Sequence, residues 1–358
     1  MNEREALLSA ARRASEILDE FEVKKRVSEG YTRVDAELIA SSSDVVVLYR
    51  KLDLLLGGFL REDGAPGIIV NWDRPRGLVH MTCAHELGHF ALGHESTSDV
   101  TVDVGRNAAM VEQQANQFAY ALLAPAWLVA ATMRQKKWSR SHLRRPAIVY
   151  QLSLRLGISY KAMVWSLVRL GHLAIADANQ IVNTQPISLK REALGGKSPN
   201  ESKKDVWLLS SSDRERILEP AIGDQFIFEL PNHAGSGHLW SIDEVQSEGF
   251  TLQPFVRDAR QEGETSNRPV IVGGDGSPMR YELMAETASV KSTAKDNEEA
   301  QSEQVSKRHS IAVRETTPWQ PASSTADAFS LAAEFKVLKT GFPQPERERR
   351  LAENRTNQ

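Results

Sequence analysis

The sequence predicts a multidomain protein in which an α+β region is followed by an all-β region. Up to residue 175, apolar residues recur mostly at helical spacing, with one short strand among them. Residues 176–205 are polar and contain a glycine-rich turn, and beyond them short apolar runs are separated by turns. Helical spacing favours helices, and alternation favours strands. At 358 residues the chain is long enough for two domains, each with its own core.

The first strand and the helix after it are predicted together. Residues 67–71 form a short apolar run, and the next helix has Asp73 as a candidate N-cap and Pro75 in its first turn. Gly93 is placed to end this helix. Because the strand leads directly into the helix, we expect its edge to be open for pairing with an extended peptide.

This helix contains the pattern His85-Glu86-Leu87-Gly88-His89, which is the signature of zinc metallopeptidases. On an ideal helix the two histidines are about 40° apart around the axis and about 6 Å apart along it, so both rings can reach one metal ion. Glu86 is rotated by about 100° from His85, which places it beside the metal and suits a general base for water activation. The alternative is a histidine pair in a core without metal, or an enzyme that has lost its activity.

A third ligand is expected from a second helix at residues 112–119, where small and apolar residues recur at helical spacing. Glu112 is the best candidate. Asn116 lies one turn further along the same face, where its side-chain oxygen can accept a hydrogen bond from the other nitrogen of a ligand histidine.

His94 invites a reading with three histidine ligands. That pattern needs Gly at position 92 and His at position 95, and this chain has Leu92 and Glu95. On an ideal helix His94 points about 180° away from His85. We therefore expect His94 to cap the helix end or to lie on the surface.

Basic charge is concentrated in a segment without acidic residues between Glu112 and Asp177. Within it, residues 147–170 read as helix, tight turn and helix, with Ser159 as the second N-cap, which is the outline of a helix-turn-helix. We assign a basic helical subdomain to residues 134–175. Its basic face suits docking of a protein substrate, and direct binding of nucleic acid is the alternative. The basic residues are Arg134, Lys136, Lys137, Arg140, Arg144, Arg145, Arg155, Lys161 and Arg169.

Several of these segments together resemble the ImmA/IrrE family of metallopeptidases, over roughly residues 5–172. The resemblance is carried by Gly57-Gly58-Phe59-Leu60-Arg61, Ile69-Val70-Asn71, Cys83 to His89, Glu112 to Ala119 and Leu122-Leu123-Ala124-Pro125. It implies a gluzincin-like fold for residues 1–175, with metal ligands at His85, His89 and Glu112 and a catalytic base at Glu86. It further implies Zn²⁺, with Mn²⁺ as the alternative ion. Asn116, where related peptidases commonly have Asp, and Cys83 are departures from the family pattern.

The resemblance also implies a biological setting. Relatives act in the bacterial cytoplasm on helix-turn-helix repressors or antitoxin-like partners, so a role in transcription regulation and stress response is implied. Composition agrees, since the net charge is −3 and a lone cysteine allows no disulfide within the chain. No apolar run is long enough for a bilayer, and we expect a cytoplasmic protein without membrane contact.

The second region, residues 206–342, is predicted as a β-sandwich that follows a linker at residues 176–205 and precedes a charged tail at residues 343–358. Its predicted strands are the apolar runs at residues 226–230, 239–242, 250–252, 270–272, 281–284, 311–313 and 329–338. This region resembles the chagasin-type cysteine-protease inhibitors, which implies an immunoglobulin-like sandwich with three loops at one end. The loop residues that correspond are Gly235, Ser236, Gly237, His238, Trp240, Gly274, Asp275, Gly276 and Trp319. The alternative is that the tryptophans belong to the core and the glycines to ordinary turns.

The function predicted from the sequence is a metal-dependent endopeptidase that cleaves a regulatory protein, joined to a β-sandwich that recognises partners or regulates cleavage. The rival hypothesis is a non-catalytic protein that sequesters a repressor or a protease. Metal content separates the two, because a site that has lost its activity is not expected to retain stoichiometric zinc.

Overall fold

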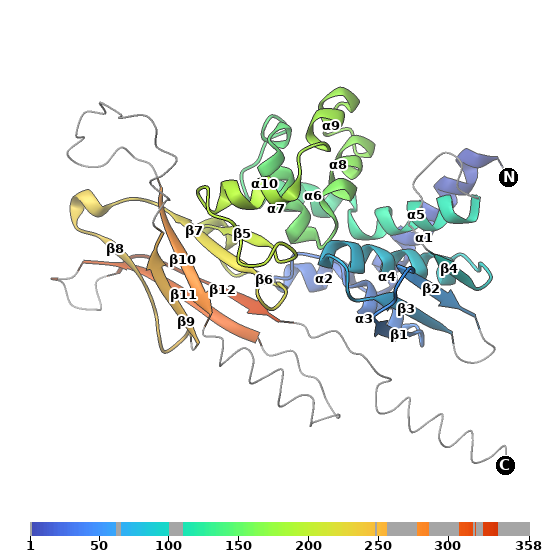
Figure 1. Cartoon of the computed structure of the whole chain (residues 1–358), viewed down its shortest axis with the longest axis horizontal. Helices are drawn as coiled ribbons and strands as arrows, with labels where there is room; N and C mark the ends of the chain where they lie inside the picture. The colour runs from blue at the N-terminus through green and yellow to red at the C-terminus, as the bar shows by residue number, and fades with distance from the viewer. Residues whose placement is uncertain are drawn as a thin grey trace, which may run out of the picture.

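The computed structural model describes residues 2–61, 66–99, 110–247, 249–255, 278–285, 308–317, 319 and 325–335. Figure 1 shows a mostly helical region beside a sheet-rich region, as the sequence predicts for a multidomain α+β chain. Among the helices of the described part, none is long and apolar enough to cross a membrane.

The first region combines five helices with a four-stranded sheet. The sheet has the order β1-β3-β2-β4, with β1 parallel to β3 and β2 antiparallel to both of its neighbours. Its central strand buries Ile68 and Val70, while Ile69 on the other face is 37% exposed. These elements are α1 (Glu3–Glu20), α2 (Val23–Ser28), α3 (Ala36–Ser42), β1 (Val46–Arg50), β2 (Gly57–Leu60), β3 (Gly67–Asn71), α4 (Arg76–Ala91), β4 (Thr97–Asp99) and α5 (Met110–Leu123).

The strand before α4 does not have an open edge. β3 lies between β1 and β2 and pairs with both of them. The expectation that this strand offers its edge to a peptide is therefore wrong, because long-range pairing places it inside the sheet. On the β2 side, the described sheet ends at β4.

The predicted helix is α4, but its N-cap differs from the prediction. The cap position is Pro75, without a side-chain hydrogen bond. Asp73 forms salt bridges with Lys51 and Lys203 at 3.3 and 2.8 Å, so its carboxylate balances two cations. Gly93 ends the helix as predicted, with φ at +76°.

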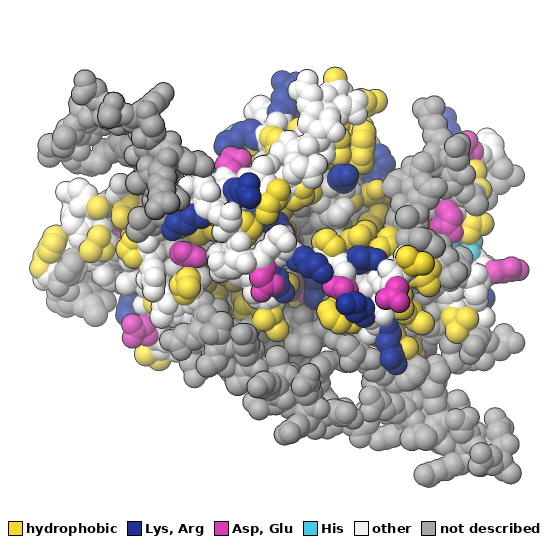
Figure 2. Space-filling model, viewed as in Figure 1, with side chains coloured by type: hydrophobic (Ala, Val, Ile, Leu, Met, Phe, Trp, Pro, Cys, Tyr) yellow, Lys and Arg dark blue, Asp and Glu magenta, His cyan; other side chains and the backbone are white. Residues whose placement is uncertain are grey.

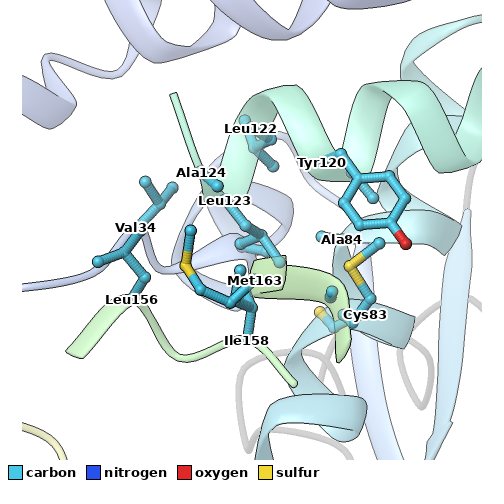
Figure 3. Packing of buried hydrophobic residues seen from close by; sticks show 14 of the residues in the cluster. Val34, Cys83, Ala84, Tyr120, Leu122, Leu123, Ala124, Leu156, Ile158 and Met163 are labelled. Carbon is cyan, nitrogen blue, oxygen red and sulfur yellow. The ribbon is translucent and has the colours of Figure 1, made fainter. Parts of the chain in front are cut away.

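Six short helices follow, and each of them contributes buried residues to the same core as α4 and α5. These six are α6 (Ala126–Gln135), η1 (His142–Arg144), α7 (Pro146–Leu156), α8 (Tyr160–Arg169), α9 (Ile175–Ile181) and α10 (Pro186–Ala193). The Ser159 side chain caps α8 by accepting a hydrogen bond from the Ala162 amide, as predicted. Figure 3 shows Leu123 of α5, Met163 of α8 and Cys83 of α4 among the packed residues. The helix-turn-helix interpretation of α7 and α8 stays a prediction.

The polar segment at residues 176–205 is not extended. It contains most of α9 and all of α10, and α10 contacts α7 and β5. The buried Lys190 ammonium lies 3.1 Å from Asp205 and donates to the carbonyl oxygens of Ser202 and Lys204. The assignment of this segment as a domain boundary stays a prediction.

The second region forms two four-stranded sheets, with orders β5-β7-β10-β9 and β6-β12-β11-β8. Residues from both sheets share one apolar cluster, in which the rings of Phe228 and Phe329 are 6.1 Å apart. The elements are β5 (Val206–Leu209), η2 (Ser211–Asp213), β6 (Ile217–Leu218), β7 (Gln225–Leu230), η3 (Ala234–Ser236), β8 (Leu239–Ile242), β9 (Phe250–Pro254), β10 (Met279–Ala285), β11 (Arg308–Thr316) and β12 (Thr325–Glu334).

Most predicted strands of this region are confirmed. The run at 329–338 belongs to β12, which starts four residues earlier, at Thr325, and ends at Glu334. The run at 270–272 and the tail at 343–358 lie outside the described residues.

Buried polar contacts join the two regions along α7. β5 is an edge strand of its sheet, and side chains of α7 bind its backbone. The Tyr150 hydroxyl accepts from the Val206 amide, and the Gln151 side chain donates to the Val206 carbonyl oxygen and accepts from the Leu208 amide. Arg155 binds both carboxylate oxygens of Asp213, at 2.9 and 3.1 Å. The side chains of α7 thus satisfy backbone groups of β5 that another strand would otherwise pair with.

Candidate metal centre

Three side chains from α4 and α5 meet in the first region. The Nε2 atoms of His85 and His89 are 3.0 Å apart, and they lie 3.2 and 3.5 Å from the two carboxylate oxygens of Glu112. Both histidines are fully buried, and the Glu112 side chain is 21% exposed. Within the described residues, these three form the group of acidic, histidine or cysteine side chains that could hold a metal ion.

The donor spacing fits a tetrahedral metal ion. Zinc–nitrogen bonds of about 2.0–2.1 Å at tetrahedral angles place neighbouring donors about 3.3 Å apart. The two Nε2 atoms are 3.0 Å apart, and each lies 3.2 or 3.5 Å from a different oxygen of the Glu112 carboxylate, so all three distances are close to that value. Two imidazoles and one carboxylate are also a ligand set that zinc prefers.

The Glu112 carboxylate is held in the charged form that a metal ligand needs. Hydrogen bonds with His85 and His89 lower the pKa of Glu112 well below its ordinary value, and they outweigh the opposing effect of burial. A charged carboxylate beside two imidazoles favours a cation among them.

Glu86 lies on the same helix but outside this group. It is fully buried, and a Cβ atom added at Gly57 of β2 would lie 3.1 Å from its Oε1 atom. The same Cβ would lie 2.5 Å from Thr82 Cγ2 and 2.9 Å from the Ile69 carbonyl oxygen. Only glycine at position 57 leaves this space, so β2 and α4 together confine the Glu86 carboxylate.

His94 lies at the end of α4, as expected, but its ring faces the candidate ligands and does not point away from them. Its Nδ1 atom is 3.1 Å from the Nδ1 atom of His89, and the two ring centroids are 5.1 Å apart. The extrapolated ideal helix was wrong here because α4 ends at Ala91 and the backbone reverses at Gly93. Burial, and then the proximity of His89, lower the pKa of His94, which favours its neutral form.

Arg61 is a second residue that the sequence reasoning missed. Its Nε atom donates to the His94 carbonyl oxygen at 2.9 Å, and its Nη2 atom donates to the Phe90 carbonyl oxygen at 3.0 Å. These carbonyls belong to the end of α4, where a cation is favourable. Arg61 therefore ties the end of β2 to the end of the metal-binding helix.

Asn116 is buried at 5% exposure, one helical turn after Glu112 on α5. Its proposed hydrogen bond to a ligand histidine stays a prediction.

The residues predicted to lie in the loops of the second region have different positions in the structure. Gly235 and Ser236 form part of η3, and His238 follows it, with its Nδ1 atom 2.9 Å from the Ser236 hydroxyl. Trp240 is a buried core residue that donates to the Pro231 carbonyl oxygen, as in the alternative interpretation. Gly274, Asp275 and Gly276 lie outside the described residues.

Trp319 remains a candidate for partner contact. Its residue is 69% exposed, and its ring approaches Gly237 so closely that any Cβ there would collide with it. The 234–238 turn and residue 319 therefore adjoin at the surface.

The group formed by His85, His89 and Glu112 lies inside a segment that matches a known protein family. Residues 40–166 match the model of the peptidase family Peptidase_M78, described as the IrrE N-terminal-like domain. This confirms the resemblance to the ImmA/IrrE metallopeptidases for these residues and supports a metallopeptidase-type function for them. No curated protein matches the chain.

Two solved structures resemble part of the chain. One is the crystal structure of the cysteine protease inhibitor EhICP2 from Entamoeba histolytica, with 11% identity, a TM-score of 0.24, and coverage of 37% of this chain and 97% of that chain. The other is the solution structure of amebosin, with 18% identity, a TM-score of 0.23, and coverage of 37% and 98%. The first of these two carries the name of the protein class that residues 206–342 resemble in sequence.

Proposed function

We propose that the chain is a metal-dependent endopeptidase in which His85, His89 and Glu112 hold a divalent cation and Glu86 is the general base. The observation that carries the proposal is the convergence of the two imidazole Nε2 atoms, 3.0 Å apart, on the Glu112 carboxylate, with each nitrogen within 3.5 Å of one of its oxygens. Two nitrogen donors and one oxygen donor favour Zn²⁺, with Mn²⁺ as the alternative.

The residues divide the chemistry of peptide hydrolysis between them. A divalent cation, when bound, polarises a carbonyl group and lowers the pKa of a water molecule. Glu86 takes the proton from the attacking water and returns it to the leaving amine. Burial of Glu86 beneath β2 keeps bulk water from competing for the carboxylate.

The substrate we propose is a protein segment in extended conformation. β4 ends the described sheet and directly follows α4 in the chain, so its outer edge can pair with the backbone of a peptide. Backbone pairing would allow cleavage within a regulatory protein, and we propose a helix-turn-helix repressor or an antitoxin-like protein.

A protein partner is favoured over nucleic acid, because several of the basic residues are buried or paired with acidic side chains. Lys136 and Arg155 are buried against Asp213, and Arg144 pairs with Asp177 at 3.1 Å. Basic and acidic side chains are mixed across the face in Figure 2, and a nucleic-acid site is expected to show one dominant sign. The β-sandwich would then present its exposed residues, such as Trp319, to the protein partner.

The test compares the full chain with its Glu86→Gln variant, both loaded with zinc. Elemental analysis should find about one zinc ion per chain in each protein, because Glu86 is not a ligand. After incubation with a bacterial lysate, mass spectrometry should find new N-termini with the wild type. Glu86→Gln should produce them about 10² to 10⁴ times more slowly.

Two outcomes would contradict the proposal. If the wild-type protein generates no new N-termini, the chain is not an endopeptidase. If Glu86→Gln loses its zinc as readily as His89→Ala, the division into base and ligands is wrong.

A further inference from the structure

The end of α4 brings His94 back onto the ligand histidine His89. The Gly93 amide donates to the Phe90 carbonyl oxygen at 3.1 Å, and the His94 amide donates to the His89 carbonyl oxygen at 3.0 Å. These two bonds, with Gly93 in the left-handed region, form a Schellman motif. In this motif the residue after the glycine contacts the residue five positions before it, which here is His89.

The contact that follows is between polar ring atoms. Schellman motifs usually join two apolar side chains at these positions. Here the Nδ1 atoms of His94 and His89 are 3.1 Å apart, within hydrogen-bond distance. Such a bond requires that one nitrogen carry a proton and that the other accept it.

Metal binding decides which nitrogen donates. The Nε2 atom of His89 faces His85 and Glu112, so this atom is the one available to a cation. Its Nδ1 atom then carries the remaining proton and donates, and His94 Nδ1 must accept. A histidine that accepts at Nδ1 is neutral and holds its own proton on Nε2.

His94 is held in this orientation from two further sides. Arg61 binds the His94 carbonyl oxygen at 2.9 Å, and the Gln114 side chain, on the helix that bears Glu112, hydrogen-bonds to the His94 ring. Arg61, which follows β2, thus holds the His94 backbone, and Gln114 of α5 holds its ring, which is itself not a member of the ligand group.

We infer that His94 is a positioning residue that orients His89 and fixes its tautomer by accepting a hydrogen bond from His89 Nδ1. The inference rests on the proposed metal site. Partners of this kind orient the ligand ring and raise its basicity, and their loss typically lowers metal affinity by about 10- to 100-fold.

Two variants of the full chain separate the hydrogen bond from simple packing. His94→Leu removes the acceptor but keeps a bulky side chain, and an apolar contact is normal at this place in a Schellman motif. His94→Asn keeps an oxygen that can accept near the position of Nδ1. His142→Leu, a substitution of an η1 histidine outside the cluster, is the control.

The measurement is the zinc dissociation constant, obtained by competition with a chelator, together with the Tm of the metal-free proteins. We expect His94→Leu to bind zinc about 10- to 100-fold more weakly, with His94→Asn and His142→Leu close to the wild type. The metal-free Tm of His94→Leu should match that of the wild type.

Each other result has a separate meaning. Equal zinc affinity in His94→Leu and wild type overturns the inference alone, and so does an equal loss in His94→Asn. Weaker zinc binding in His94→Leu, in a protein that cleaves nothing, leaves the inference standing and overturns the proposed endopeptidase. A wild-type chain that binds no zinc overturns both.

Discussion

Gly88 sets how closely the two ligand-bearing helices approach each other. A Cβ atom at this position would lie 3.0 Å from the ring of Phe118 and 3.2 Å from the Ala115 carbonyl oxygen on α5. Ala115 is itself small and fully buried. At the scale of single residues, these two small side chains let Glu112 reach the histidines one helix away.

Glu112 and Asn116 should differ in their effect on the metal. We expect Glu112→Gln to lower zinc affinity strongly, because a neutral amide is a poorer ligand than a carboxylate. Asn116→Ala should lower zinc affinity by about 10- to 100-fold, as for a residue that supports a ligand. Chelator competition on both variants measures the difference, and unchanged zinc content in Glu112→Ala would require another ligand.

At the scale of elements, the turn between α7 and α8 packs against the first turns of α4. The His80 Nδ1 atom lies 3.1 Å from the Gly157 carbonyl oxygen. A Cβ at Gly77 would lie 2.6 Å from the Ile158 carbonyl carbon and oxygen. The turn between α7 and α8 therefore shares a packed surface with α4.

Gly157→Ala should test this packing, with Gly171→Ala as the matched control. Both glycines have positive φ, +67° and +68°, so both substitutions carry a backbone cost of about 1–2 kcal/mol. At Gly157 the new Cβ would also lie 2.7 Å from Arg33 Cδ and 2.9 Å from His80 Nδ1, whereas nothing lies within 4 Å at Gly171. We expect Gly157→Ala to lose about 1–3 kcal/mol more in free energy of unfolding, measured in urea. Equal losses would contradict the contact.

A second prediction at this scale concerns the start of β7. Burial and then the negative charge of Asp205 raise the pKa of Asp224 to about 6. The stabilisation from a protonated Asp224 is present in full at acid pH and is lost as the pH rises through about 6.

Asp224→Asn should make the free energy of unfolding less dependent on pH. The variant keeps only one of the two oxygens that accept from the Asp205 amide and from the Trp207 ring nitrogen, so it loses an acceptor and is less stable overall. The difference between wild type and variant should nevertheless shrink by roughly 1–3 kcal/mol between about pH 4 and about pH 7. A constant difference across that range would show that Asp224 titrates normally.

At the scale of the whole molecule, buried ion pairs hold the β-sandwich against the helical region. Asp213 is 1% exposed and binds Arg155 and Lys136, the latter at 2.7 Å. Burial opposes the charge on Asp213, but Arg155 and Lys136 still lower its pKa. Because two cations share one carboxylate, burial and the charge of Arg155 also lower the pKa of Lys136, to about 8.

A second buried cluster of charged side chains also joins the two regions. Glu219 accepts from Arg33 at 2.7 Å and from Arg26 at 3.1 Å. A chain cut within residues 176–205 would leave Arg155 and Arg33 without these acids. We therefore expect the isolated first region to be less stable than the full chain.

Asp213→Asn in the full chain should measure the cost directly. Removing one partner of a buried ion pair typically costs about 3–5 kcal/mol, because the other charge remains buried. Asp327→Asn is the control, since Asp327 and its partner Arg214 are 42% and 47% exposed and such surface pairs contribute about 0–1 kcal/mol. Similar free energies of unfolding for both variants would contradict the role of Asp213 in joining the regions.

Local spacing along the chain was enough to predict part of the candidate site. Histidines four residues apart on one helix share a face whatever surrounds the helix, and Glu112 was recognisable on a second amphipathic helix. The alternation of Phe226, Phe228 and Leu230 predicted β7 in the same way, since residues two apart lie on one face of a strand.

Contacts between residues far apart in the sequence could be known only from the folded structure. Arg155 looked like part of a basic surface, yet it is buried because Asp213, far along the chain, supplies the opposite charge. The order of strands in the first sheet and the pairing of Asp73 with Lys203 are likewise long-range choices without a local signal. The position of His94 was predictable only in part. The glycine before it is typical of a Schellman motif, but its partners Arg61 and Gln114 come from segments that fold onto the helix end.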